Sequence, residues 1–119
     1  MGLHCMATRE LGIGVDIESI SRFRRLNFSK NRKFYEKIFT KREIDYCRSK
    51  RNSSQHFAAR FCAKEAFIKA TYMTVDDYRD IEVRVSRTKP VIVWNKKKYL
   101  LSLSHEKDKA IAFVLVNHE

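Results

Sequence analysis

The most regular pattern in the sequence predicts a long helix over residues 55–72. Two neighbouring stripes repeat at steps of four, three and four residues, which is the spacing of a helix face. The first stripe is Phe57, Phe61, Lys64 and Ile68, and the second is Ala58, Cys62, Glu65 and Lys69. The second stripe is mostly small or apolar, so it places a carboxylate and an ammonium at the edge of a packed face. An i,i+4 ion pair between Glu65 and Lys69, worth about 0.2–0.5 kcal/mol, is the simplest explanation of these two charges.

A second pattern predicts a half-buried strand ahead of this helix. Residues 11–18 alternate between apolar and other side chains, which is the period of a β-strand. The face that is not apolar carries Gly12 and Gly14 before Asp16, so no side chain crowds the approach to the Asp16 carboxylate. Glycine inside a strand often marks the close approach of a ligand or of another backbone.

The remaining patterns predict an α+β fold. Helices are expected over residues 30–38 and 41–49, and the second begins with a capping box of Thr40 and Glu43. Strands are expected over residues 81–85, 91–94, 99–104 and 110–116. The last strand is apolar on both faces, which predicts a central strand that is covered on both sides. This order of elements predicts helices packed against a largely antiparallel sheet.

Length and charge narrow the class of protein. The 119 residues suit one domain, with residues 1–9 expected as an N-terminal extension and residues 10–119 as the domain. No apolar run approaches the ~20 residues of a membrane span, so no membrane partner is expected. Three scattered cysteines fit reduced thiols in a cytoplasmic protein. The net charge of +11 is concentrated in residues 22–51 and indicates an acidic protein, a nucleic acid or a phosphorylated ligand as partner.

Two motifs resemble signatures of the phosphopantetheinyl transferase superfamily. The first is Gly-Ile-Gly-Val-Asp-Ile-Glu at residues 12–18 followed by Arg22, and the second is Arg-Phe-Cys-Ala-Lys-Glu-Ala-Phe-Ile-Lys-Ala at residues 60–70. Shorter likenesses follow in the family's order at residues 39–44, 80–83, 89–90 and 101–105. The combination, in a short basic chain, is similar to the single-domain branch of the superfamily, the holo-acyl-carrier-protein synthases.

The resemblance implies a reaction and a metal site. Phosphopantetheine would move from coenzyme A to a serine of an acidic acyl carrier protein, releasing adenosine 3′,5′-bisphosphate, in fatty acid biosynthesis. Asp16 and Glu65 match the family's ligands for magnesium, and the choice between magnesium and manganese stays open. Lys69 matches the lysine that contacts phosphate. Glu65, or a water held by the metal and Glu65, would serve as the general base.

The resemblance also implies binding residues and partners. Lys64, Arg60 and His105 are expected to contact coenzyme A, although each is also explained as an ordinary surface or strand-end residue. Arg22 and Arg25 are expected to contact the acidic carrier protein, whose encounter such charges would steer. The family is typically a homotrimer with active sites between subunits, so the same assembly is expected here, without nucleic acid as a partner.

One departure from the family keeps two alternatives open. The family often has a Gly-rich turn after the second motif, whereas residues 71–76 contain no glycine, so the edge of the coenzyme A pocket is in question. A catalytically inactive relative that still binds the carrier protein would fit this departure. A small nucleic-acid-binding module would fit the charge and the interleaved aromatic residues, but no recognised motif of that class is present and Asp16 and Glu65 would have no purpose in it.

Overall fold

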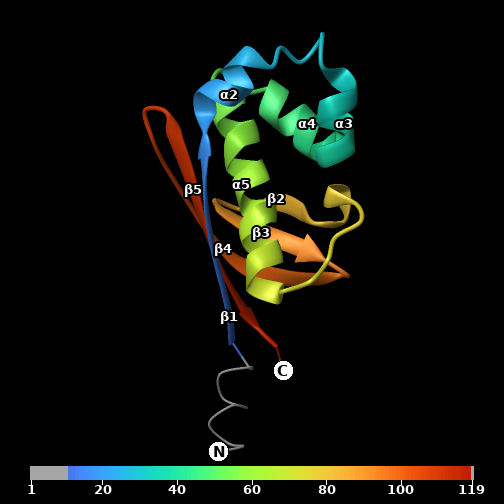
Figure 1. Ribbon diagram of the computed structural model, residues 1–119, viewed down its shortest axis with the longest axis vertical. Helices are drawn as coiled ribbons and strands as arrows, with labels where there is room; N and C mark the ends of the chain where they lie inside the picture. Colours follow the sequence, from blue (N-terminus) through green and yellow to red (C-terminus); the bar gives the residue numbers. More distant parts are fainter. Residues whose placement is uncertain (1–10, 119) are drawn as a thin grey trace, which may run out of the picture.

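A sheet with one long helix along its face forms the body of the protein (Figure 1). The computed structural model describes residues 11–118. In chain order the elements are β1 (Leu11–Ser19), α2 (Ile20–Arg25), α3 (Arg32–Ile38), α4 (Lys41–Arg48), α5 (Ser53–Thr71), the 3-10 turn η1 (Tyr78–Asp80), β2 (Glu82–Ser86), β3 (Lys89–Trp94), β4 (Lys97–Glu106) and β5 (Lys109–Asn117). The predicted α+β class is confirmed, while the expected extension over residues 1–9 lies outside the described residues.

The five strands form one antiparallel sheet in the order β1-β5-β4-β3-β2. The chain enters the sheet at one edge with β1, and β2 lies at the opposite edge. Helices α2, α3 and α4 gather at the beginning of α5, and the β4–β5 hairpin reaches the same end of the molecule (Figure 1). Among the described residues, no helix has the length and apolar character needed to span a membrane.

The glycines of β1 allow this strand to lie directly against α5. A Cβ on Gly12 would come within 1.9 Å of the Ala70 carbonyl oxygen, and a Cβ on Gly14 within 1.8 Å of the Ala66 carbonyl oxygen. Neither position accepts a side chain unless the helix moves. Of the two explanations for these glycines, close approach of another backbone is therefore the one observed.

The apolar face of β1 points away from α5 and is exposed in the single chain. Its side chains are 53–59% exposed: Leu11, Ile13, Val15 and Ile17. The same outer face of the sheet includes Leu100 of β4 and Phe113 of β5. Strand β5 lies between β1 and β4, as expected for an interior strand, but the prediction that both of its faces are covered is wrong, because Phe113 is 44% exposed. The reason is that all the helices lie on the other face of the sheet.

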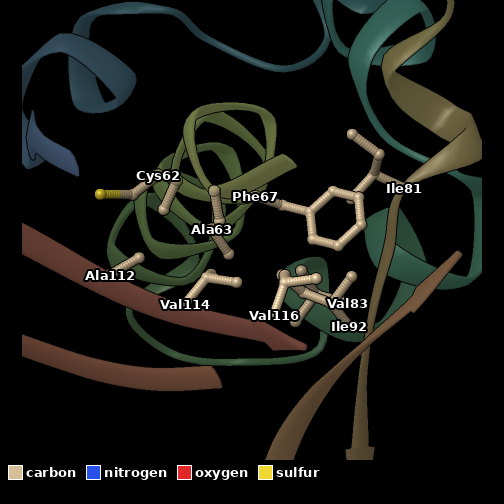
Figure 2. Close-up of a cluster of buried hydrophobic side chains, with 11 residues drawn as sticks. Cys62, Ala63, Phe67, Ile81, Val83, Ile92, Ala112, Val114 and Val116 are labelled. Carbon is tan, nitrogen blue, oxygen red and sulfur yellow. The ribbon is translucent and has the colours of Figure 1, made fainter. Parts of the chain in front are cut away.

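Helix α5 contributes to two buried clusters. The first lies between α5 and the sheet, where side chains of the helix and of β2, β3 and β5 point toward one another (Figure 2). Its labelled members are Cys62, Ala63, Phe67, Ile81, Val83, Ile92, Ala112, Val114 and Val116. The second cluster joins the first half of α5 to the short helices, and its rings are Phe23, Tyr35, Phe39 and Phe57. The two clusters together fix α5 against the sheet on one side and α2–α4 on the other.

Helix α2 was not expected from the sequence. It has only six residues, which is too short for a periodic pattern, and it begins against the β4–β5 hairpin. The Ile20 backbone N–H donates to the Asp108 carbonyl oxygen at 2.7 Å, and the Ser21 N–H donates to Asp108 Oδ1 at 2.8 Å. A residue far along the chain therefore satisfies the first backbone donors of this helix.

Candidate active site

Asp16 and Lys69 meet where β1 runs along α5. Lys69 Nζ lies 3.0 Å from Asp16 Oδ1 and donates to the Val15 carbonyl oxygen at 3.0 Å. The Asp16 side chain is 13% exposed and that of Lys69 is 55% exposed, so the carboxylate lies inside the rim and the ammonium at the surface. Gly14 lies two residues before Asp16 on the same face of β1, and the close packing that it permits allows this approach. Lys69 thus pairs with Asp16, and the simple i,i+4 pair with Glu65 is not what the structure shows.

Glu65 lies one helical turn before Lys69 and accepts a hydrogen bond from the Tyr78 hydroxyl at its Oε1. Burial, and then this hydrogen bond and the charges of Glu65 and Asp16, raise the pKa of Tyr78 to about 12, so the phenol stays protonated at neutral pH. Burial, followed by Asp16 and to a smaller extent Glu65, also raises the pKa of Glu18. Asp16 of β1 is thus brought to one region with Glu65 and Lys69 of α5.

One oxygen of Asp16 is left for a cation. Asp16 Oδ2 is buried and has no hydrogen-bond partner among the described residues, which is a costly state for a carboxylate. Magnesium is usually held by one or two carboxylates and completes its coordination with water and substrate phosphates. No group of three or more His, Cys, Asp or Glu residues could hold a metal within residues 11–118. The donors present therefore suit a hard cation that shares its coordination with a phosphorylated substrate.

Lys64 does not join this site. Its side chain is fully buried, and Nζ lies 2.9 Å from Glu43 Oε1 while donating to the carbonyl oxygens of Tyr78 and Ile81. These three acceptors use all three N–H bonds of the ammonium. Burial lowers the pKa of Lys64, and the Glu43 carboxylate opposes that shift. The expected contact between Lys64 and coenzyme A is incompatible with this burial, because the side chain points toward α4 and η1.

Arg60 and His105 lie in a positively charged region around the first half of α5. Burial, and then interactions with Arg60, Lys50 and His105, lower the pKa of His56, which indicates that these side chains are neighbours. Arg60 is 4% exposed, its guanidinium lies 4.2 Å from the centre of the Tyr46 ring, and its Nε has no hydrogen-bond partner among the described residues. His105 is exposed at the end of β4.

The two arginines expected to contact the carrier protein are both on α2 and both exposed. Arg22 lies 3.4 Å from Glu18 Oε1, and its guanidinium lies 5.5 Å from the centre of the Phe61 ring. Arg25 donates to the Ser21 hydroxyl at 3.3 Å. Helix α2 therefore presents positive charge to solvent beside Phe61, which lies one turn before Glu65 on α5.

The turn after α5 forms without the glycine that the family often has there. Tyr72 ends the helix in the left-handed conformation with φ 57°, and its side chain is 83% exposed. Residues other than glycine adopt this conformation at a cost, because Cβ approaches the following carbonyl oxygen. Helix α5 therefore ends at Tyr72 in a conformation that is less favourable for tyrosine than for glycine.

Two contacts near the site were not expected from the sequence: the hydrogen bond from Tyr78 to Glu65, and the ion pair between Glu43 and Lys64. Tyr78 lies in a short 3-10 turn with no periodic pattern, so nothing in the sequence connects it with Glu65. The capping box correctly predicted Glu43 at the start of α4. A capping box is a local signal, however, and it carries no information about the bond from Glu43 to Lys64 on another helix.

Comparisons with known proteins agree with this fold and identify the family. A family model described as the 4′-phosphopantetheinyl transferase superfamily matches residues 12–114, which defines the class of protein. The holo-[acyl-carrier-protein] synthase of Cytophaga hutchinsonii is 40% identical over 124 residues, a match that covers 89% of this chain and 96% of the relative. Within the superfamily, the chain belongs to the holo-[acyl-carrier-protein] synthase family.

Solved structures of this family share the fold. A holo-(acyl-carrier-protein) synthase from Bacillus anthracis, in complex with CoA (3′,5′-ADP), matches with a TM-score of 0.77 and 31% identity, covering 91% of this chain and 96% of that one. The holo-[acyl-carrier-protein] synthase of Helicobacter pylori, in complex with coenzyme A, also has a TM-score of 0.77 and 31% identity, covering 88% of this chain and 99% of that one.

Proposed function

We propose that this protein transfers 4′-phosphopantetheine from coenzyme A to a serine of apo-acyl carrier protein and releases adenosine 3′,5′-bisphosphate. The observation that carries the proposal is the convergence of Asp16, Glu65 and Lys69 from two elements, with one buried Asp16 oxygen free of partners. Family relatives that were solved with coenzyme A support the choice of donor. Phosphoryl transfer depends mostly on positioning and on charge neutralisation, which Lys69 and a cation held by the two carboxylates would supply.

Asp16 and Glu65 would hold a magnesium ion, or manganese in its place, against the pyrophosphate of coenzyme A. When bound, the cation neutralises and polarises the phosphates. Asp16 would bind through the buried Oδ2, while Lys69 restrains Oδ1. Because the Lys69 side chain is half exposed, its ammonium can also contact a phosphate oxygen without leaving the rim of the site.

The serine hydroxyl of the carrier protein is the nucleophile and must lose its proton. Glu65, or a water next to it, would accept that proton as the serine oxygen attacks the phosphorus that bears the pantetheine. The bond from this phosphorus to the oxygen of the adenosine bisphosphate breaks in the same step, and the leaving group carries the negative charge away. Stabilising that charge is the role of Lys69 and of the cations around α5.

Arg60 and His105 would bind the nucleotide end of coenzyme A. His105 is exposed at the end of β4, whereas Arg60 is 4% exposed and would act on a phosphate mainly through its charge. Together with burial, which has the largest effect, both side chains lower the pKa of His56. A phosphate group would compensate the positive charge of this region.

Arg22 and Arg25 would contact the acidic carrier protein. Both arginines lie on the exposed side of α2, and residues 22–51 contain twelve lysines or arginines against three acids. Charge of this density steers the encounter with an acidic partner and orients it before close contact. The carrier serine would then reach Glu65 across the Phe61 side of α5.

The expected assembly, compartment and pathway also belong to this proposal. The exposed apolar face of β1, β4 and β5 supports a homotrimer with active sites between subunits, because a large apolar patch on a small protein usually marks a contact surface. The free buried thiols of Cys47 and Cys62 suit the reducing cytoplasm. Fatty acid biosynthesis is the proposed pathway, and residues 10–119 are the proposed transferase domain, which the match over residues 12–114 supports.

Mass spectrometry of apo-acyl carrier protein incubated with this protein, coenzyme A and magnesium tests the function. The expected result is a mass gain of one phosphopantetheine group on the carrier, lost when EDTA removes the metal. No gain with folded protein and several carriers would contradict the proposal and favour the inactive, carrier-binding relative. Salt-sensitive binding to RNA in the same preparation would favour the nucleic-acid-binding alternative.

A further inference from the structure

Tyr78 connects the carboxylate of Glu65 to the turn η1. The Tyr78 hydroxyl donates to Glu65 Oε1, and the Tyr78 ring stacks on Phe61 with centroids 6.0 Å apart and planes inclined by 9°. Phe61 precedes Glu65 by one turn of α5, so the ring and the hydroxyl contact the same side of the helix. The stacked ring sets the position of the phenol, and the hydrogen bond sets its direction.

A buried ion pair holds the backbone of Tyr78 in place. Lys64 Nζ donates to the Tyr78 carbonyl oxygen at 3.0 Å and lies 2.9 Å from Glu43 Oε1. Glu43 is itself held by two backbone donors, Thr40 N–H at 2.9 Å and Val83 N–H at 2.8 Å. A continuous set of contacts therefore runs from α4 and β2 through Lys64 to Tyr78. The last contact in the set is the hydrogen bond from the Tyr78 hydroxyl to Glu65.

From this geometry we propose that Tyr78 is a positioning residue that orients Glu65 toward the metal ion. The inference rests on the proposed function, because it takes Glu65 as a metal ligand. With Oε1 engaged by the hydroxyl, the Glu65 carboxylate keeps one rotational position and presents Oε2 to the cation. A ligand that is already oriented loses less conformational freedom when the ion binds. Residues that hydrogen-bond to a metal ligand contribute roughly 10–100-fold to metal affinity.

Manganese binding to the protein saturated with coenzyme A, whose phosphates would complete the coordination of the ion, tests the inference without any turnover, because no carrier protein is present. The signal of free Mn²⁺ in electron paramagnetic resonance gives its Kd for the wild type, Tyr78→Phe and Tyr99→Phe. Tyr78→Phe keeps the ring on Phe61 and removes only the hydroxyl. Tyr99→Phe makes the same chemical change at a ring that packs on Phe67 at 5.1 Å, so it is the matched control. The Kd is expected to rise about tenfold in Tyr78→Phe and to stay unchanged in Tyr99→Phe.

Transfer kinetics give a second readout that a merely structural role would not produce. The magnesium concentration for half-maximal transfer is expected to rise in Tyr78→Phe by about the same factor as the Kd, while the KM for the carrier protein stays at the wild-type value. Thermal unfolding of both tyrosine variants checks that the fold is retained. An Mn²⁺ Kd in Tyr78→Phe equal to that of the wild type overturns the inference.

The experiment also separates this inference from the proposed function. If the wild type binds Mn²⁺ but transfers no phosphopantetheine, the proposed function fails and the Kd comparison still decides the role of Tyr78. If the wild type binds no Mn²⁺, the metal assignment of Glu65 and the positioning role of Tyr78 are both overturned.

Discussion

Lys64 and Glu43 form an ion pair that has no exposed side-chain surface on either partner, with Nζ 2.9 Å from Oε1. Removing one member of such a pair leaves a buried charge without compensation, which costs about 3–5 kcal/mol. We therefore expect Lys64→Met to lower the free energy of unfolding by that amount in urea denaturation. The double variant Lys64→Met/Glu43→Gln should recover a large part of the loss, because it leaves no charge behind.

Lys41→Met is the matched control for this prediction. Lys41 pairs with Asp45 at 3.0 Å, but the two side chains are 89% and 64% exposed, so water screens the pair. Its removal should cost no more than about 0.5 kcal/mol. A similar small cost for Lys64→Met would contradict the explanation by a buried ion pair.

Asp16→Ala and Glu65→Ala should each lower transfer by roughly 10³-fold, because each removes a ligand of the cation that neutralises the phosphates. The fold should remain, since neither side chain belongs to the buried apolar clusters. The measurement is the initial rate of carrier modification, with circular dichroism as the check on folding. Near-full activity in either variant would show that the residue does not bind the metal.

Arg22→Glu should raise the KM for the carrier protein by about tenfold and leave the KM for coenzyme A unchanged, because the exposed guanidinium would meet the acidic partner and not the nucleotide. Lys98→Glu changes the net charge equally on β4, away from α2, and is the control. An equal rise of both KM values in Arg22→Glu would remove this residue from the carrier interface.

Asp108 should make the stability of the protein depend on pH in the acid range. The hydrogen bond from the Ser21 N–H has the largest effect on Asp108 and, with the Ser21 hydroxyl and the charge of Lys109, holds its pKa below the ordinary value of 3.8, although burial opposes this shift. A carboxyl whose pKa is depressed by folding contributes stability above its unfolded pKa and loses it as the pH falls through the folded value.

The corresponding experiment compares the wild type with Asp108→Asn by urea denaturation between pH 7 and acid pH. The wild type should be the more stable protein at neutral pH, and the difference should shrink once the pH falls below the ordinary pKa of 3.8. A difference that is constant over this range would show that the charge of Asp108 does not contribute to the attachment of α2.

Tyr72→Gly should stabilise the protein by about 0.5–1 kcal/mol, because glycine accepts the left-handed conformation at the end of α5 without strain. The Tyr72 side chain is 83% exposed, so its loss removes little buried surface. Tyr72→Ala keeps a Cβ in the same conformation and should give no such gain. Thermal unfolding of the three proteins measures the effect, and equal stability of Tyr72→Gly and Tyr72→Ala would contradict the explanation by backbone strain.

The part of the site that could be predicted from the sequence is the part encoded by regular spacing. The glycine-bearing strand and the long helix are both periodic, and their motifs singled out Asp16, Glu65 and Lys69, which the structure brings to one region. The metal-binding and phosphate-binding roles of these residues stay predictions. The same periodicity also predicted the class of fold. These signals are local, because a repeat of two or of 3.6 residues can be recognised within one segment without knowledge of the rest of the chain.

The rest could not be predicted because it depends on contacts between distant segments. Alternation in β1 indicates two faces but does not say which one meets the helix, and only the approach of Ala66 to Gly14 decides it. Lys64 and Lys69 look alike in the sequence, yet one is enclosed by α4 and η1 while the other is at the rim. Asp108 reaches α2 from the far end of the chain.

The absence of side chains between β1 and α5 has a mechanical consequence for the site. Most helices and sheets are separated by a layer of side chains that can repack and absorb small displacements, but at Gly12 and Gly14 backbone meets backbone. Asp16 and Lys69 project from the two sides of this contact, so the separation of their backbones is set by two main chains in direct contact. Loosening of the core elsewhere, by heat or by substitution, should therefore reach the turn that carries Tyr78 before it reaches the Asp16–Lys69 pair.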